Sequence, residues 1–151
     1  MRRSAKLSRQ LAQIAALQAL KQAGSRGELG EAKVAHAEAE TALATSSEAL
    51  DASARDLDAV LTYDVLDFDR WRIGRALLND LENHRDAAAE KVVSRGNAVS
   101  NAQDAFGREC ARTDRIHSVR RKFARLSTEK RDESATLEAN ELAALRGGKR
   151  P

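Results

Sequence analysis

The sequence has almost nothing that would interrupt a helix, form a disulfide or build a broad aromatic core. Its only proline is the last of 151 residues, it holds one cysteine, and aromatic residues make up 3% of the chain. Without internal proline, helices can run unbroken, and a single cysteine excludes an intrachain disulfide. The hydrophobic 42% includes much alanine, which favours helix but buries little apolar area. The composition therefore predicts a thin helical bundle rather than a wide globule.

Long apolar runs are also missing. The strongest, "AVLTYDVL", falls far short of the ~20 residues that a membrane-spanning helix needs. Near the start, glutamines interrupt the apolar letters of "LAQIAALQALKQ", unlike the core of a secretory signal. We therefore expect a cytoplasmic protein without stable membrane insertion. The lone Cys110 agrees, and we interpret it as a small helix-surface or seam residue rather than a reactive thiol.

Residues that could build a catalytic or metal site are not grouped. No two of the three histidines share the i,i+4 spacing and carboxylate company of a metal-binding helix. The glycine-rich "GSRGELG" lacks the lysine and Ser/Thr ending of a phosphate-binding loop. Asp67 and Asp69 are better explained as helix N-caps than as an acid/base pair. We predict a protein that is not an enzyme, with no catalytic, metal or cofactor-binding residues and no cofactor.

Two stretches carry the heptad pattern of a coiled coil, whose seam residues recur at alternating steps of three and four. The first seam comprises Ala32, His36, Ala39, Leu43, Ser46, Leu50, Ser53, Leu57 and Val60. The second comprises Leu78, Leu81, Arg85, Ala88, Val92, Arg95, Val99, Ala102, Phe106, Glu109, Thr113, Ile116, Arg120 and Phe123 and extends to Leu137. Small and polar residues occupy many positions, so we expect close but weak pairing that tolerates a third partner. His36 is expected to limit register or oligomeric state as a polar seam residue.

A crossover separates the two patterns, because Tyr63, Phe68 and Trp71 cluster there and the two aspartates precede a renewed helical pattern. We predict an all-α fold, a long two-helix antiparallel coiled-coil hairpin in one domain over residues 1–151. Helix one is expected at about 4–62, the crossover at about 63–70, helix two at about 71–146 and a flexible tail at 147–151.

The glycine-rich stretch is predicted to weaken the first helix. Gly24, Gly27 and Gly30 each cost a helix interior ~1 kcal/mol relative to alanine. The apolar phase upstream also fails to continue into Leu29 and Ala32; its residues are Leu7, Leu11, Ile14, Leu17 and Leu20. We therefore expect a kink or a locally frayed stretch there.

Charge is segregated along the chain. Residues 1–30 carry six Lys/Arg against one Glu, residues 31–70 three against ten Asp/Glu, and residues 108–132 nine against four. In an antiparallel hairpin the two basic blocks lie toward the same end, so the pattern predicts electrostatic orientation of a partner. The alternative is that each charge run is a solvated helix face.

The plan of the chain resembles the FliJ/YscO family of flagellar and virulence type III export systems. The resemblance lies in "LSRQLAQIAALQALKQ" opening a long helix, the aromatic crossover "FDRWRIGRALLNDLENH", and the terminal helix "RRKFARLSTEKRDESATLEANELAAL". It implies a monomeric, non-catalytic coiled-coil stalk, peripheral to the inner-membrane export apparatus. Its implied partners are a hexameric export ATPase, the cytosolic domain of the export gate and export chaperones. The glycine-rich stretch departs from the family pattern and puts a continuous rigid stalk in doubt.

Basic residues at the terminal end are the predicted partner-binding residues, with solvated charge as the alternative at each. They are Arg2, Arg3, Lys6, Arg9, Arg120, Arg121, Lys122, Arg125, Lys130 and Arg131. The alternative function is a basic helical-hairpin adaptor that binds nucleic acid or another protein outside secretion. We expect no nucleic-acid binding, because Phe106 and Phe123 lie on the seam and acidic residues interleave with the cations.

Overall fold

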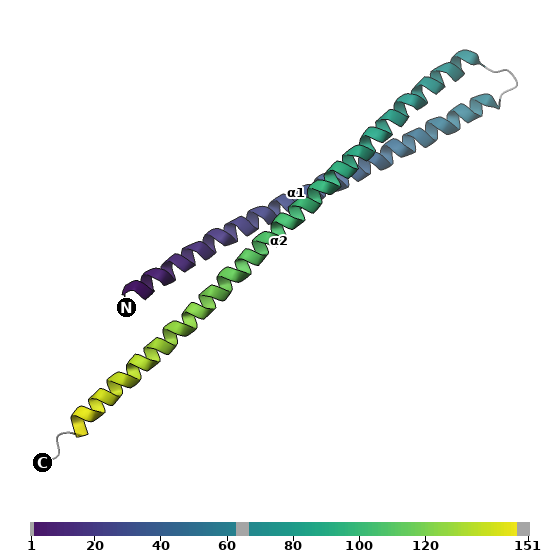
Figure 1. Cartoon of the computed structure of the whole chain (residues 1–151). Helices are drawn as coiled ribbons and strands as arrows, with labels where there is room; N and C mark the ends of the chain where they lie inside the picture. Colours follow the sequence, from purple (N-terminus) through teal and green to yellow (C-terminus); the bar gives the residue numbers. More distant parts are fainter. Residues whose placement is uncertain (1, 63–66, 148–151) are drawn as a thin grey trace. The chain divides into compact units, whose positions relative to one another are not determined.

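The computed structural model describes residues 2–62 and 67–147, which form two helices and no strand (Figure 1). Helix α1 spans Arg2–Leu61, 60 residues, and helix α2 spans Phe68–Gly147, 80 residues. The all-α prediction is confirmed, and both helices are slightly longer than expected. Neither described helix holds a stretch apolar enough to cross a bilayer. Tyr63, placed in the predicted crossover, lies outside the described residues.

Asp67 starts helix α2, as its position before the helical pattern predicted. The backbone N–H of Arg70 donates to Asp67 Oδ1 at 3.1 Å, and the N–H of Trp71 donates to the Asp67 carbonyl oxygen at 3.0 Å. This is the bonding of an N-cap residue, and it moves the start of α2 upstream of the predicted residue 71. Asp69 lies in the first turn, where its charge complements the helix dipole. Phe68 and Trp71 stack with ring centroids 5.6 Å apart.

The predicted weak point in the first helix is not a break. Residues 24–30 are helical like their neighbours, and no described glycine has a positive φ. The prediction of fraying was therefore wrong for this stretch. The cost of glycine is real, but it is smaller than the cost of ending and restarting hydrogen bonding inside a 60-residue helix.

The chain divides into two compact units, each with a segment of both helices. Unit 1 comprises Met1–Gly24 and Gly107–Pro151, and unit 2 comprises Ser25–Phe106. In each unit the α1 segment packs against the α2 segment in the opposite direction, which confirms the two-helix antiparallel hairpin (Figure 1).

In unit 2 the predicted first seam is confirmed along its whole length. All nine predicted residues from Ala32 to Val60 are less exposed than their helical neighbours on the outer face, and Leu57 is 9% exposed. Opposite it, Leu78 is 8% exposed, and these two are the buried hydrophobic residues of the described chain. The facing seam begins earlier than predicted, at Trp71 and Gly74.

Two glycines of α2 allow the helices of unit 2 to approach closely. A Cβ built on Gly74 would lie 2.8 Å from Leu57 Cδ1, and one built on Gly96 would lie 3.4 Å from His36 Nε2. His36 is half-buried on the seam as predicted, and its Nδ1 lies 3.7 Å from Glu40 Oε1. Small residues thus give the close approach that the dilute seam predicted.

In unit 1 the seam differs from the predicted apolar phase. The less exposed residues of α1 are Leu11, Ala15, Gln18 and Gln22, which keep the four–three alternation in phase with Leu29 and Ala32. The phase failure predicted from the upstream leucines was therefore wrong, because the seam passes through Gln18 and Gln22 rather than through Leu17 and Leu20.

On α2, three predicted seam residues are exposed: Arg95, Arg120 and Leu137. Next to Arg95, Gly96 occupies the position that faces α1, and the long side chain of Arg95 reaches solvent. Every described side chain from 128 to 145 is exposed, so the predicted seam ends near Ser127 rather than at Leu137.

Candidate partner-binding surface

Unit 1 is strongly basic. It contains seventeen Lys/Arg against seven Asp/Glu, whereas unit 2 contains nine against sixteen. Because the two segments of unit 1 run antiparallel, residues that precede Gln18 on α1 lie alongside residues that follow Thr113 on α2. The structure therefore brings the two predicted basic groups onto one unit.

The predicted partner-binding residues that the structure describes are all exposed. They are Lys6 and Arg9 on α1 and Arg120, Arg121, Lys122, Arg125, Lys130 and Arg131 on α2. The side chains of Arg2 and Arg3 lie outside the described part. None of the eight forms an ion pair with a described carboxylate, so their charge faces solvent.

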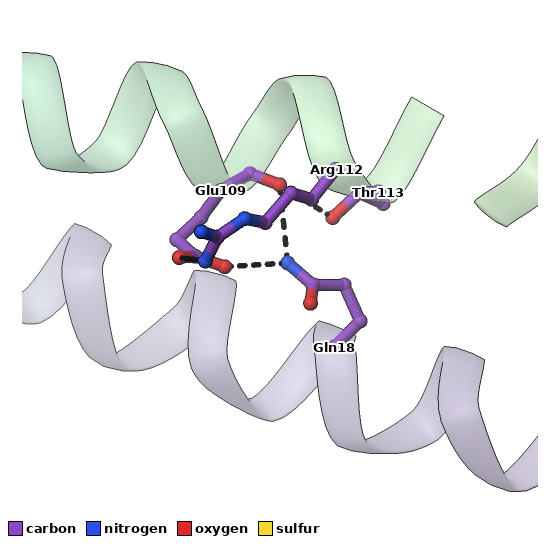
Figure 2. A network of polar contacts seen from close by, with 4 residues as sticks. All are labelled: Gln18, Glu109, Arg112 and Thr113. Atoms are coloured by element: carbon purple, nitrogen blue, oxygen red, sulfur yellow. Dashed lines mark hydrogen bonds and ion pairs between the residues drawn. The ribbon is translucent and has the colours of Figure 1, made fainter. Parts of the chain in front are cut away.

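A polar network joins the two helices of unit 1 (Figure 2). Gln18, 8% exposed, donates from Nε2 to Glu109 Oε2 at 2.6 Å and to the Glu109 carbonyl oxygen at 3.2 Å. Arg112 Nη1 donates to the other carboxylate oxygen, Oε1, at 2.6 Å. Both amide hydrogens of Gln18 and both oxygens of Glu109 thus have partners, which removes the penalty of burying them.

Gln22 extends the network by one turn. Its Nε2 donates to Cys110 Sγ at 3.2 Å, and its Oε1 lies 2.9 Å from the Thr113 hydroxyl. That hydroxyl also lies 3.0 Å from the Glu109 carbonyl oxygen and donates to one of the two at a time. Cys110 is half-exposed and contacts the seam, which agrees with its predicted place. Polar seam residues that need specific partners disfavour other alignments of the two helices.

The network perturbs the acidity of Glu109. The hydrogen bond from Gln18, followed by the positive charges of Arg112 and Lys21, lowers the pKa of this carboxyl below its ordinary value against the opposing effect of desolvation. The side chain is 15% exposed. The ionised form is therefore the one that the folded unit 1 prefers.

We expect the contribution of Glu109 to stability to disappear in acid. Its folded pKa is depressed, so the contribution is present above the unfolded value of about 4.3 and is lost as pH falls through the folded pKa. Glu109→Gln should destabilise the protein near pH 7. The difference in unfolding free energy from wild type should narrow as the pH falls below about 4.3 and close once the pH is below the folded pKa of Glu109. Chemical unfolding followed by circular dichroism measures this. A difference between Glu109→Gln and wild type that stays constant from neutral to acid pH would contradict the prediction.

Sequence reasoning missed the network and the apolar residues beside it. Glu109 and Thr113 were placed on a seam, but no pattern in the letters indicated Gln18 and Gln22 as their partners. A usable signal was the phase itself, because a four–three alternation backward from Leu29 passes through both glutamines. That phase also leaves Leu7, Leu17 and Leu20 outside the seam.

The described residues form no cluster of three or more His, Cys, Asp or Glu that could hold a metal ion. His36 has one carboxylate neighbour, and the buried side-chain polar atoms of the described part all have hydrogen-bond partners. The arrangement offers charge and apolar surface for recognition. The prediction that the protein is not an enzyme stays a prediction.

No protein-family model, curated protein or solved structure matches the chain. The resemblance to the FliJ/YscO plan therefore stays a prediction. Function has to be argued from the surface of unit 1 and the charge that it carries.

Proposed function

We propose that the protein is a non-catalytic coiled-coil stalk component of a type III protein-export apparatus, flagellar or virulence. In this proposal unit 1 docks on a hexameric export ATPase and the chain links that ATPase to the cytosolic domain of the export gate. Export chaperones are further proposed partners. The protein is monomeric alone and acts in the cytoplasm at the inner-membrane apparatus.

The observation that carries the proposal is the exposed, unneutralised charge of unit 1. The eight described cations face solvent on two antiparallel segments that a satisfied polar network holds together. Such a surface accelerates encounter with an acidic protein and sets its orientation. A two-helix unit with this charge suits docking against a larger assembly. The named partner comes from the family resemblance.

The alternative is a basic adaptor that binds nucleic acid, and the charge of unit 1 is the observation in its favour. Acidic residues interleave with the cations on α2, and the aromatic Phe123 lies half-buried on the seam. Base stacking therefore has no exposed aromatic partner in the described part of unit 1.

We predict that reversing three cations of unit 1 weakens binding to the export ATPase. The variant Arg121→Glu/Lys122→Glu/Arg125→Glu should lower the affinity by about tenfold or more and remove much of its salt dependence, because the electrostatic attraction between these three cations and the partner is lost. The three side chains are exposed, so helicity should stay at the wild-type level. Binding to the purified ATPase, followed by surface plasmon resonance at two salt concentrations, measures the effect.

The matched control reverses three exposed cations of unit 2, Arg70, Arg72 and Arg75, which are spaced over a similar length of α2. It should leave ATPase binding close to wild type. Loss of binding in the control but not in the unit 1 variant would mean that unit 2, rather than unit 1, docks on the ATPase. Submicromolar, sequence-dependent DNA binding would instead favour the alternative, since non-specific binding lies at ~10⁻⁴ to 10⁻⁶ M.

A further inference from the structure

An apolar strip lies on one side of unit 1 with no partner in the described chain. It consists of Leu7, Ile14, Leu17, Val119 and Leu126, whose exposed fractions range from 48% to 61%. Scattered single leucines on a surface need no explanation, but these five recur at heptad spacing on two packed helices. Leu11, Ile116 and Phe123 lie on the seam of these two segments, whereas the five residues of the strip lie outside it.

The heptad places these residues on the same side. Ile14 and Leu126 each directly precede a seam residue, Leu7 lies one heptad before Ile14, and Val119 lies one heptad before Leu126. Two antiparallel helices present their heptad positions in mirrored order across the seam, so equivalent flanking positions on both helices lie together. The other flank, here called the closed flank, is the one on which Cys110, which directly follows Glu109, contacts Gln22. The strip lies on the opposite flank of the seam.

Unpaired cations edge the same side. Lys21, Arg115 and Lys122 occupy the flanking and outer positions beside the strip, are exposed, and have no ion pair with a described carboxylate. Over residues 2–24 and 107–127 the sequence has twelve Lys/Arg, and its only acidic residues are Glu109 and Asp114. Glu109 is held in the seam network, and Asp114 follows the seam residue Thr113 on the closed flank. An apolar strip between cations is complementary to an apolar face between carboxylates.

We infer that this strip binds a third helix, an amphipathic helix of a partner protein with apolar residues at heptad spacing and Asp or Glu on both flanks. Its apolar face covers the five exposed apolar side chains and completes a three-helix bundle around a two-helix seam that is partly polar. A second copy of this chain is disfavoured, because the same strip would bring cations against cations. A lipid surface is disfavoured, because the strip has no aromatic residue and follows a seven-residue repeat that matches a helix.

This inference rests on the proposed docking role of unit 1 and names the kind of segment that it accepts. Its test needs no export ATPase, so the two can fail separately. A lost ATPase interaction with intact peptide binding contradicts the proposed function alone, and the converse contradicts this inference alone.

The probe is a designed peptide of four heptads, with leucine at the first and fourth heptad positions and glutamate at the fifth and seventh, labelled with fluorescein. Repulsion between the glutamates keeps it from pairing with itself. Titration with the full chain, followed by fluorescence anisotropy, should give saturable binding that weakens between about 0.05 and 0.5 M salt. A peptide with lysine in place of every glutamate, and one with the leucines distributed around the helix, should bind at least about tenfold more weakly.

Two pairs of variants of the protein locate the site. Ile14→Ser/Leu17→Ser should weaken peptide binding by about tenfold or more through lost apolar contact, and Val34→Ser/Val93→Ser, exposed positions of unit 2, should not. Arg115→Glu/Lys122→Glu should weaken it by about tenfold, whereas Arg9→Glu/Arg121→Glu, at equally exposed positions on the closed flank, should have less effect. Circular dichroism confirms the fold of each.

Three results would overturn the inference. Equal peptide binding by wild type and Ile14→Ser/Leu17→Ser would place the contact elsewhere. Concentration-dependent dimerisation in sedimentation equilibrium, abolished by that variant, would make a second copy the occupant. Strip-dependent binding to vesicles with anionic lipids, without binding to the glutamate peptide, would make the strip a membrane contact.

Discussion

Replacing Gly24, Gly27 and Gly30 with alanine is expected to raise the free energy of unfolding by about 2–3 kcal/mol in total. All three lie inside α1 with ordinary helical φ, and a Cβ on any of them would meet nothing within 4 Å. Each substitution therefore gains helix propensity and restricts the unfolded chain without a steric cost. For a chain of this size the gain corresponds to roughly 5–10 °C in Tm.

Thermal unfolding followed by circular dichroism measures the effect, and each single substitution should contribute about one third because the positions share no side-chain contact. Gly107→Ala, at an equally open position of α2, should give a similar single gain of about 1 kcal/mol. A triple variant no more stable than wild type would mean that residues 24–30 are not helical in solution, in agreement with the fraying that the sequence predicted.

Truncating Leu57 is expected to destabilise unit 2 by about 2–3 kcal/mol, near the lower end for buried leucine, because the seam is narrow. Leu57 is 9% exposed and packs where α2 presents Gly74 rather than a side chain. Gly74→Ala alone should give none of the gain expected at the open glycines. Its Cβ would lie 2.8 Å from Leu57 Cδ1, and overpacking of this kind costs about 1–3 kcal/mol.

The double variant Leu57→Ala/Gly74→Ala should be more stable than Leu57→Ala by about 1 kcal/mol or more. The shorter side chain removes the clash, and the new methyl group fills part of the space that it leaves. Gly74→Ala therefore changes sign with the residue at position 57, and a double-mutant cycle from urea unfolding measures that coupling. Equal effects of Gly74→Ala in both backgrounds would mean that the two residues do not meet as the structure places them.

Local sequence signals predicted the two helices and the start of α2 well. The absence of internal proline and the abundance of alanine determine helix over nearly all described residues, and these preferences act within a few residues along the chain. Asp67 was recognisable as a cap because a capping side chain bonds to backbone two or three residues away. The seam from Ala32 to Val60 was readable for a similar reason: leucines alternate there with small residues in one phase.

The polar half of the seam could not be predicted in the same way. Gln18 and Gln22 look like solvent residues, and the leucines around them look like core. Hydrophobicity alone would bury Leu17 and Leu20, which are 61% and 71% exposed. The seam of the structure keeps the same heptad phase along all of α1. The hydrogen bonds of Gln18 and Gln22 with Glu109 and Thr113 offset the cost of placing these polar side chains on the seam.

The candidate surface, too, was predicted only in part. The exposure of the cations was predicted residue by residue, because most positions of a two-helix element face solvent and charged side chains favour those positions. Their convergence on unit 1 needed only the antiparallel topology. The apolar strip beside them needed the seam phase, and that depends on which residues α2 presents to α1.

The sequence by itself determined the helical class, the cap at Asp67, the two-helix plan and the segregation of charge, because each follows from local backbone preference, periodicity or composition. Only the tertiary structure decided that the glycine-rich stretch stays helical, that Gln18 and Gln22 rather than Leu17 and Leu20 lie on the seam of unit 1, and that Gly74 lies against Leu57. The last two depend on contacts between residues more than ten positions apart, whose free energies outweigh local preferences of about 1 kcal/mol per residue. The helix through residues 24–30 follows instead from the cost of ending and restarting hydrogen bonding inside α1.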